Sequence, residues 1–409
     1  MRFSSSLEFN RALTGLINLR AGVEKYQQQV SSGRKVQTAS DDPVAASQVL
    51  NIGERMSAME QYNRNANLAD LRLSDQELAL TSSVNTLQRV RELLLTGRNG
   101  SLTPDDRRYL NSEIQQRLQE LVGVANTRNA NGEYIFSGTQ VDTRPFAPDT
   151  AGNVAYLGDQ TVRELTVAEG RTVAEGFSGQ DVFMGVRNGN GVFVSALAGG
   201  NAGTGRVIND TVTDRSAWVP QQYTLQFDAV DPTKYTVLDA GGNPVLDANG
   251  NAMSGLTYSD GAAISFNGIS FAITGTPAAG DSFTIAPSAN QSIFSTVQNV
   301  VTAMQAVPVT DAQKAQLTFN IDRAIQDLDQ SMNKMTELRA AIGGRQNTIE
   351  AQVTSNTNTV DQLTKVKSTL EDADPVEAIS KLAQYSQLLE AAQASFVKVQ
   401  NLSLFNYLR

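Results

Sequence analysis

The sequence predicts a mainly α-helical protein with a β-rich insertion. Both ends of the 409-residue chain carry an apolar stripe at helical spacing, and long helical patterns lie next to them. The middle of the chain instead gathers glycine, proline and short alternating runs. We therefore expect paired N- and C-terminal helices forming a coiled-coil stem, an elongated helical bundle as a rod, and an outer β domain.

The C-terminal stripe lies in residues 376–409, which contain no Gly or Pro. Asp374 and Glu377 bracket its start as a capping box, and Pro375 suits the first helical position. Apolar residues then recur at alternating steps of three and four, which is the seam of a coiled coil. The predicted seam consists of Leu382, Tyr385, Leu389, Ala392, Phe396 and Val399, and apolar residues continue as Leu402, Leu404 and Phe405.

The N-terminal stripe has the same spacing, in Phe9, Ala12, Leu16, Leu19, Val23, Tyr26 and Val30. Each stripe is too narrow to form a core, and isolated helices of this length are marginal in water. Burial of a large apolar side chain contributes roughly 1.5–3 kcal/mol, so pairing of the two ends is favourable. The alternative is that each helix docks separately on a globular body. The seam residues are the predicted assembly interface.

Composition excludes most enzyme classes. The chain contains no Cys and no His, which removes disulfides, thiol nucleophiles, the usual general base and most transition-metal sites. We expect no catalytic residues, no cofactor and no metal site. No run of 18 apolar residues and no signal peptide are visible, so a membrane is not an expected partner.

Charge is distributed unevenly along the chain. Residues 1–40 hold six basic and two acidic residues, a pattern that could bind membranes or nucleic acid. A solvated face opposite the seam explains it more simply. Residues 140–290 hold 15 acidic and 7 basic residues, which argues against a nucleic-acid partner.

Three further long helices are predicted between the ends. One starts at Asp42 and Pro43 and continues to about residue 96, and another starts at Pro104. The third extends from about residue 310 to 370. Its apolar frame is interrupted by polar residues, which are typical of wet layers or register-setting contacts. The interrupting residues are Arg339, Gln346, Asn356 and Lys367.

The middle of the chain predicts short strands. The clearest are residues 223–227, 235–238, 263–266, 269–273 and 282–285, with a two-residue hairpin turn at Asn267 and Gly268. Residues 133–137 also read as a strand. Residues 247–251 begin like a calcium loop, but Ala252 and Tyr258 replace the required Gly and Glu, so a hairpin tip is the better interpretation.

Several blocks of residues resemble the flagellin superfamily. The N-terminal block is residues 32–36, Ser-Gly-Arg-Lys-Val, followed by residues 40–46, Ser-Asp-Asp-Pro-Val-Ala-Ala. The C-terminal block is residues 339–343, Arg-Ala-Ala-Ile-Gly, followed by residues 372–374 and the final helix. Within the superfamily, residues 131–138, Asn-Gly-Glu-Tyr-Ile-Phe-Ser-Gly, are more similar to the hook-associated members than to filament flagellin.

This resemblance implies a structural component of the bacterial flagellum, an adaptor that joins hook to filament through its terminal helices. The alternative is a filament-forming flagellin, and an enzyme hosted by the β domain is the least favoured hypothesis. The implied partners are copies of the chain in a ring, other hook-associated proteins, flagellin and an export chaperone. The implied location is extracellular, after type III export without a cleaved signal peptide.

The expected domains follow from these boundaries. Residues 1–38 and 376–409 form the terminal coiled-coil stem. Residues 39–199 and 289–375 form the helical rod with β-hairpins, and residues 200–288 form the β-rich outer domain.

Overall fold

The computed structural model describes residues 2–100, 102–150, 153–247, 249–306 and 308–405, although the side chains of residues 2–6, 8 and 399–405 are outside this description. The chain divides into two compact units. Unit 1 contains residues 1–65 and 351–409, and unit 2 contains residues 66–350. Each unit is considered by itself below.

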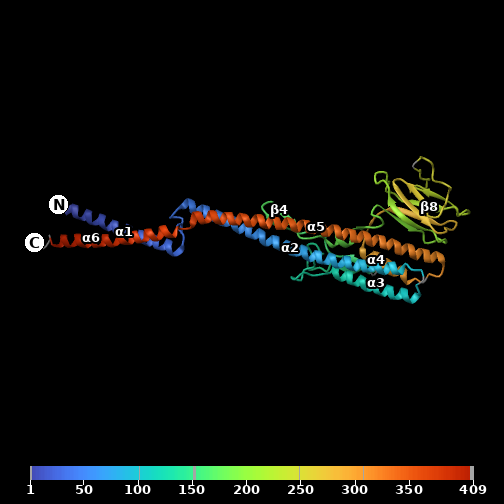
Figure 1. The fold of residues 1–409 in the computed structure, drawn as a ribbon, viewed down its shortest axis with the longest axis horizontal. Coiled ribbons are helices and arrows are strands. Elements are labelled where there is room, and N and C mark those ends of the chain that lie inside the picture. Colours follow the sequence, from blue (N-terminus) through green and yellow to red (C-terminus); the bar gives the residue numbers. More distant parts are fainter. Residues whose placement is uncertain (1, 101, 151–152, 248, 307, 406–409) are drawn as a thin grey trace. The chain divides into compact units, whose positions relative to one another are not determined.

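Six α-helices make up most of the described chain (Figure 1). They are α1 (Arg2–Ser32), α2 (Pro43–Gly97), α3 (Pro104–Ala125), α4 (Ile293–Gln305), α5 (Asp311–Glu371) and α6 (Pro375–Phe405). Terminal helices around a strand-rich middle confirm the predicted mainly helical class with a β-rich insertion.

Side-chain caps set the starts of α2, α6 and α3. The Asp42 carboxylate accepts hydrogen bonds from the Val44 and Ala45 amides at 3.0 and 2.9 Å, which confirms the predicted N-cap of α2. At α6 the Asp374 carboxylate accepts from the Val376 amide at 2.8 Å. In α3 the cap is Thr103, which forms a reciprocal capping box with Asp106.

Unit 1 consists of two helix pairs. α1 lies beside α6, and the first part of α2 lies beside the last part of α5 (Figure 1). In the second pair the Asn356 side chain donates to the Asn63 side-chain oxygen at 3.0 Å. Asn356 is 3% exposed, so this amide pair replaces an apolar layer in the seam.

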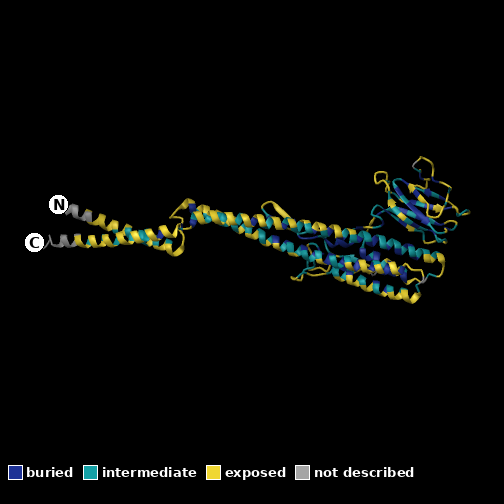
Figure 2. Ribbon diagram, in the orientation of Figure 1, coloured by how far each residue is buried: buried dark blue, intermediate teal, exposed yellow. Residues whose placement is uncertain are grey.

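The helical part of unit 2 has a continuous apolar core (Figure 2). Fully buried residues recur every seven positions on both long helices: Leu73, Leu80, Leu87 and Leu94 on α2, and Leu328, Met335 and Ile342 on α5. Two predicted interruptions of the α5 frame meet polar partners on α2. Arg339 pairs with Glu77 at 2.9 Å, and Gln346 donates to the Ser74 hydroxyl at 3.0 Å. These contacts fix the register between the two helices.

Fourteen short strands occur in the described part of unit 2. They are β1 (Phe146–Pro148), β2 (Val154–Tyr156), β3 (Glu164–Ala168), β4 (Arg171–Ala174), β5 (Val186–Arg187), β6 (Phe193–Leu197), β7 (Arg206–Val212), β8 (Tyr223–Phe227), β9 (Lys234–Leu238), β10 (Leu256–Thr257), β11 (Ala263–Phe266), β12 (Ile269–Thr274), β13 (Ser282–Pro287) and β14 (Asn290–Gln291). A single-turn π-helix, η1 (Gln180–Met184), lies between β4 and β5.

Two antiparallel sheets form a β lobe around one apolar core. The larger has strand order β10-β9-β8-β13-β6, and the smaller has order β11-β12-β7. The predicted strands at residues 223–227, 235–238, 263–266, 269–273 and 282–285 all fall in these sheets. Asn267 and Gly268 have φ of 44° and 75°, which is the left-handed backbone of the predicted two-residue hairpin turn.

The prediction of a strand at residues 133–137 was wrong. The segment is a series of turns, and its backbone groups bond to scattered partners: Ile135 donates to Thr127, and Gly179 donates to Phe136. Phe136 is fully buried and packs edge-on against Phe183, with ring centroids 5.1 Å apart. The consecutive apolar residues here anchor a loop on an aromatic cluster and do not form a strand.

The segment from Asp247 to Asn251, which begins like a calcium-binding loop in the sequence, is a hairpin tip, as predicted. The Asp247 carboxylate accepts from the Asn249 and Asn251 amides, both at 2.8 Å, and Leu246 bridges to Ala252. Within the described ranges, no cluster of three or more acidic, histidine or cysteine side chains could hold a metal ion. No described helix combines the length and apolar character that a membrane crossing would require.

Candidate functional site

Two aromatic pairs mark the contact between α1 and α6. The ring centroids of Phe9 and Phe396 lie 5.3 Å apart, and those of Tyr26 and Tyr385 lie 5.2 Å apart. Because Phe9 precedes Tyr26 while Phe396 follows Tyr385, the two helices are antiparallel. The structure thus brings residues from both ends of the sequence into one helix pair.

The seam is only partly covered within one chain. Nine of its residues are half-buried: Leu16, Leu19, Val23, Tyr26, Leu382, Tyr385, Leu389, Ala392 and Phe396. Phe9 and Val30 keep 43% and 40% of their surface exposed, and Ala12 is exposed as well. The side chains of Val399, Leu402, Leu404 and Phe405 lie outside the described residues.

A glycine that sequence reasoning missed sits at the centre of the contact. A Cβ atom on Gly22 would lie 2.4 Å from Cδ1 of Tyr385, whereas one on Gly15 would meet nothing within 4 Å. Gly22 therefore lets the Tyr385 ring lie directly on the α1 backbone. Glycine weakens a helix interior, so its presence in an otherwise regular α1 was the available signal.

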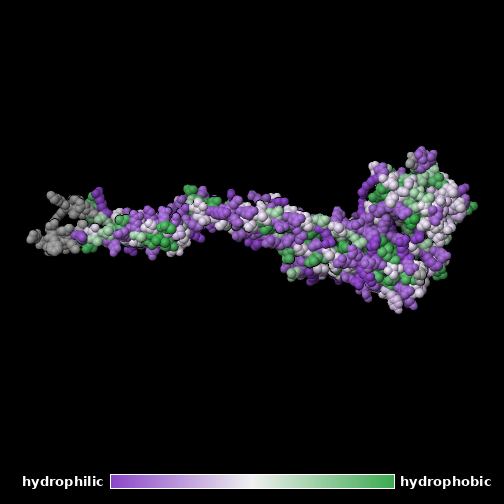
Figure 3. Space-filling view, viewed as in Figure 1, coloured by the Kyte–Doolittle hydropathy of each residue, from purple (hydrophilic) through white to green (hydrophobic). Residues whose placement is uncertain are grey.

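Large apolar side chains outside the seam of this helix pair are also open to solvent. Leu13 and Ile17 on α1 are 41% and 59% exposed, and Leu388 and Val397 on α6 are 47% and 54% exposed. Figure 3 shows apolar side chains reaching the surface of this pair. Leu13 and Ile17 are one helical turn apart and so lie on the same side of α1, where a contiguous apolar patch favours further association.

A short segment, here called a crossover, connects α1 to α2, and a second crossover connects α5 to α6. The two crossovers are hydrogen-bonded to each other. Gly33, with φ of 71°, ends α1 in the left-handed backbone that favours glycine. Its carbonyl accepts from the Ala373 amide at 2.9 Å, and the Lys35 amide donates to the Glu371 carbonyl at 2.7 Å. Arg34 and Asp372 form an antiparallel bridge between these bonds.

Charged side chains also pair between the two crossovers. Glu371 is 8% exposed, and its carboxylate lies 2.9 Å from the Arg34 guanidinium and 3.8 Å from the Lys367 ammonium. The Lys35 ammonium donates to the Thr369 carbonyl in the last turn of α5 at 2.8 Å. A cation at this end complements the negative end of the helix dipole. Two of the six basic residues of the N-terminal segment thus contact α5.

The loop before α2 is held by Asp41. Its carboxylate accepts from the Thr38 and Gln37 amides at 3.0 and 3.2 Å. These backbone hydrogen bonds hold the pKa of Asp41 below its usual range. The adjacent aspartates 41 and 42 therefore serve a turn and a helix cap, respectively.

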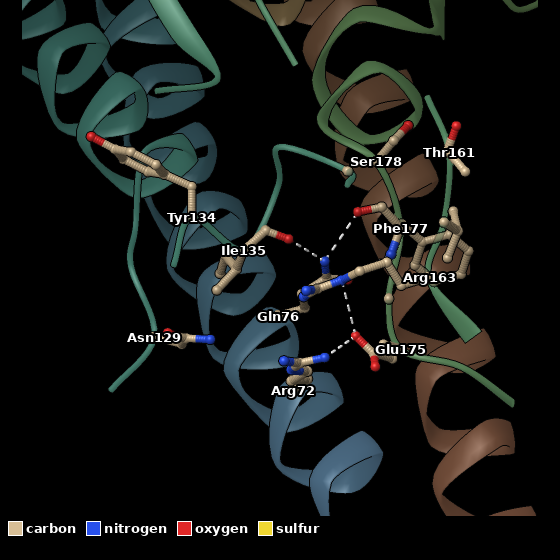
Figure 4. Close-up of a pocket in the computed structure, with 13 residues that line it drawn as sticks. Arg72, Gln76, Asn129, Tyr134, Ile135, Thr161, Arg163, Glu175, Phe177 and Ser178 are labelled. Atoms are coloured by element: carbon tan, nitrogen blue, oxygen red, sulfur yellow. Dashed lines mark hydrogen bonds and ion pairs between the residues drawn. The ribbon is translucent and has the colours of Figure 1, made fainter. Parts of the chain in front are cut away.

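In unit 2 a buried polar junction joins α2 to the turns around residues 135 and 177 (Figure 4). The Gln76 amide donates to the Ile135 and Phe177 carbonyls at 2.7 and 3.0 Å, and its oxygen accepts from the Phe177 amide at 2.8 Å. One side chain thus satisfies three backbone groups that have no sheet partner.

An ion-pair cluster completes this junction. Arg72 pairs with Glu175, which is 6% exposed, and lies 3.2 Å from the Glu133 carboxylate. Arg163 lies 3.2 Å from Glu175. A hydrogen bond from Asn129, followed by the charges of Arg72 and Arg163, lowers the pKa of Glu133. The cavity here has a volume of about 40 Å³, which is room for only a few waters.

The two ends of the chain match family models named for flagellin. The N-terminal helical region of bacterial flagellin matches residues 3–141, and the C-terminal helical region matches residues 325–408. Residues 198–287 match the D2-like domain of flagellar hook-associated protein 1. This match falls on the β lobe.

Individual relatives narrow the comparison. The chain is 32% identical to flagellar hook-associated protein 3 of Escherichia coli (strain K12) over 183 residues, which are 45% of this chain and 57% of that relative. The alignment thus spans little more than half of this curated relative.

Solved structures are matched over nearly their whole length. The crystal structure of flagellar hook-associated protein 3 from Legionella pneumophila is 32% identical, with a TM-score of 0.74, covering 79% of this chain and 98% of that one. A structure titled as the flagellar junction protein FlgL from Legionella pneumophila is 31% identical, with a TM-score of 0.70, covering 79% and 99%.

Terminal flagellin helices around a strand-rich middle define a flagellin-like structural component of the flagellum. The chain belongs to the family of flagellar hook-associated protein 3, within the flagellin superfamily. None of the relatives described above is named as an enzyme.

Proposed function

We propose that this chain is a junction adaptor that joins the flagellar hook to the filament by self-assembly of its terminal helices. The observation that carries the proposal is the antiparallel contact of α1 with α6 through the Phe9–Phe396 and Tyr26–Tyr385 pairs. Its seam is half-covered in one chain, and large apolar side chains outside the seam are exposed. A helix pair of this kind gains stability by adding neighbours.

The terminal pair acts as a coiled-coil stem in this proposal. Three observations support it: the alternating three- and four-residue spacing, the facing aromatic pairs, and the close approach of Tyr385 to Gly22. The assembly interface comprises the seam residues of both helices. It extends to Val399, Leu402, Leu404 and Phe405 by the continuity of the sequence pattern.

We divide the chain into three functional parts. Residues 1–38 and 376–409 form the stem, residues 39–199 and 289–375 form the helical rod with β-hairpins, and residues 200–288 form the outer β domain. The β6 strand at Phe193–Leu197 pairs with β13, so the fold of the lobe begins a few residues before 200.

The partners follow from the junction role. Copies of the chain join head to tail in a closed ring, a heterologous contact that limits its own growth. Other hook-associated proteins and flagellin lie on either side, and an export chaperone holds the chain before secretion. The location is extracellular, at the hook–filament junction. Neither nucleic acid nor membrane is a partner.

Filament-forming flagellin is the alternative, because the two terminal family models carry that name. Copy number separates the two roles: an adaptor is present in few copies per flagellum and a filament subunit in very many. Quantitative immunoblotting of isolated flagella measures this ratio directly.

Charge in the seam tests the junction role. Leu389→Asp with Phe396→Asp places carboxylates in the half-buried contact, and burial of an unpaired charge is costly. Cells carrying this variant are expected to build hooks and to release unpolymerised filament subunits into the medium. Gln387→Asp, an exposed position on the same helix, is the matched control. Filaments of normal length in a strain lacking this protein would contradict the proposal.

A further inference from the structure

The crossover joins segments that are far apart in the sequence. Lys35 and Thr369, whose side chain and carbonyl are bonded, are separated by 334 positions. Two backbone bonds, from Ala373 to Gly33 and from Lys35 to Glu371, lie beside that contact. We use the name crossover clamp for Gly33, Arg34 and Lys35 together with Thr369, Glu371 and Ala373.

The terminal helix pair contributes little burial of its own. Among residues 9–30 and 379–398, no side chain of the described part is fully buried. Ala378 at 3% and Val36 at 9% exposure are buried, and both lie within a few residues of the clamp. The best-packed part of this region is therefore the crossover and not the seam.

We propose that the crossover clamp positions α1 against α6, and that Glu371 is the positioning residue. This inference rests on the proposed function, in which the terminal pair is the assembly element. Once the clamp holds the end of α1 beside the start of α6, the seam residues meet at high effective concentration. The entropic cost of closing the loop of several hundred residues is incurred when the clamp forms. Pairing of the seam residues then requires no further loop closure.

Glu371 has this role because two cations depend on it. Its carboxylate faces Arg34 on one side and Lys367 on the other, and its side chain is 10% exposed. Its backbone carbonyl accepts from the Lys35 amide. Replacing the carboxylate by an amide leaves the backbone bonds in place and removes the charge between Arg34 and Lys367. Hydrogen bonds to charged groups are stronger than those between neutral groups. Most of the stability that the clamp loses in this variant should therefore come from the contacts of this carboxylate.

The experiment measures the spacing of α1 and α6 in the full chain. Because the chain has no cysteine of its own, a variant with two introduced cysteines carries spin labels at those two positions alone. Exposed positions Asn18 and Gln387 report on the terminal pair. Exposed positions Gln61 and Asn358 report on the α2–α5 pair near the Asn63–Asn356 bond. Pulsed electron–electron double resonance gives the distance distribution for each pair.

Glu371→Gln is expected to broaden the Asn18–Gln387 distribution and to leave the Gln61–Asn358 distribution unchanged. The paired fraction should shift by about tenfold, the size expected for loss of a hydrogen bond to a charged group. Glu390→Gln, the same change at an exposed glutamate of α6, is the matched control and should leave both distributions narrow. Arg34→Gln should reproduce part of the effect, and the double variant should be less than additive.

A narrow Asn18–Gln387 distribution in Glu371→Gln would overturn the positioning role. Broadening of both label pairs would overturn it too, because Glu371 would then stabilise the whole unit. The results that would contradict the junction proposal differ from those that would contradict the clamp. If Leu389→Asp with Phe396→Asp abolishes the junction while Glu371→Gln leaves the labels narrow, the clamp inference falls and the junction role stands. If Glu371→Gln broadens the terminal pair but filaments form normally, the clamp stands and the assembly role of the pair falls.

Discussion

The ring of Tyr385 occupies the space that a side chain on Gly22 would need. A Cβ at Gly22 would meet Cδ1 and Cε1 of Tyr385 at 2.4 and 2.6 Å. Tyr385 also packs against Tyr26, so one tyrosine of α6 touches α1 at two consecutive turns. This contact sets how closely the two ends of the chain approach each other.

Alanine at Gly22 tests that contact. In a free helix a Gly→Ala change favours the helix by about 1 kcal/mol. At Gly22 the new methyl displaces the Tyr385 ring, so we expect the pair to loosen despite the better helix former. Gly15→Ala is the matched control, because nothing lies within 4 Å of its Cβ position, and it should strengthen α1. Hydrogen exchange of peptides covering Leu16 and Leu389 should rise for Gly22→Ala and fall for Gly15→Ala. Equal changes in both variants would contradict the packing argument.

Local signals in the sequence predicted most of the helices. Asp42 and Asp374 were recognisable as N-caps because an acidic residue stands directly before a proline, and both cap their helices. The interruption of the α5 frame by Arg339 and Gln346 predicted polar layers, and both side chains pair with α2. These features are readable because each depends on residues within a few helical turns.

Individual contacts between residues far apart in the sequence could not be predicted. Phe136 lies in a short run of aromatic and β-branched residues that is typical of a strand, but its partner Phe183 comes from a π-helix with no clear sequence signal. Glu371 resembles any charged residue near a helix end, and only the fold brings Arg34 to it. Gly22 matters because of Tyr385, and the facing register of two helices cannot be read from either stripe alone.

Acid should weaken the β lobe through its turns. Backbone hydrogen bonds, first from Asn251, lower the pKa of Asp247 from the ordinary value of 3.8, and bonds from Asp231 and Val230 do the same for Asp228. A lowered folded-state pKa means that this stability is present above about 3.8 and is lost as the pH falls through the folded-state pKa. Asp247→Ala should therefore unfold more easily than the parent at neutral pH, and the difference should vanish in acid.

The single tryptophan makes this measurement specific to the lobe. Trp218 packs against Phe193 and Tyr223, with ring centroids 5.8 and 5.7 Å away. Urea titrations followed by its fluorescence at several pH values report the stability of the lobe. A difference between Asp247→Ala and the parent that is independent of pH would show that the turn bonds do not depend on the charge.

The buried ion pairs of unit 2 should be sensitive to loss of one partner. Arg72→Met leaves the Glu175 carboxylate with Arg163 alone in a site where it is 6% exposed. Breaking a buried pair from one side costs about 3 kcal/mol of unfolding free energy. Adding Glu175→Gln should recover part of this loss, because it removes the buried carboxylate that has lost one of its two cationic partners. Urea unfolding followed by far-ultraviolet circular dichroism measures both.

An exposed pair provides the contrast. Arg108 and Asp105 on α3 are 78% and 65% exposed, and surface pairs contribute about 0–1 kcal/mol. Arg108→Met should therefore leave the unfolding free energy nearly unchanged. If Arg72→Met proves as mild as Arg108→Met, the polar junction around Glu175 does not stabilise unit 2.

The last prediction is that the β lobe can be excised without loss of assembly. Its first and last strands pair, with Phe193 opposite Pro287, and the Ser288 amide donates to the Val192 carbonyl at 2.9 Å. The ends of the excised segment are therefore adjacent, and a short Gly-Ser linker can replace residues 193–287 with little loop-closure cost. Phe319 on α5 is 5% exposed against the lobe core, so Phe319→Gln should accompany the excision to avoid a new apolar patch. The shortened chain should keep the helical circular dichroism transition of the parent and support junction formation and swimming. Loss of the junction by a chain whose helices still fold would show that the lobe takes part in assembly.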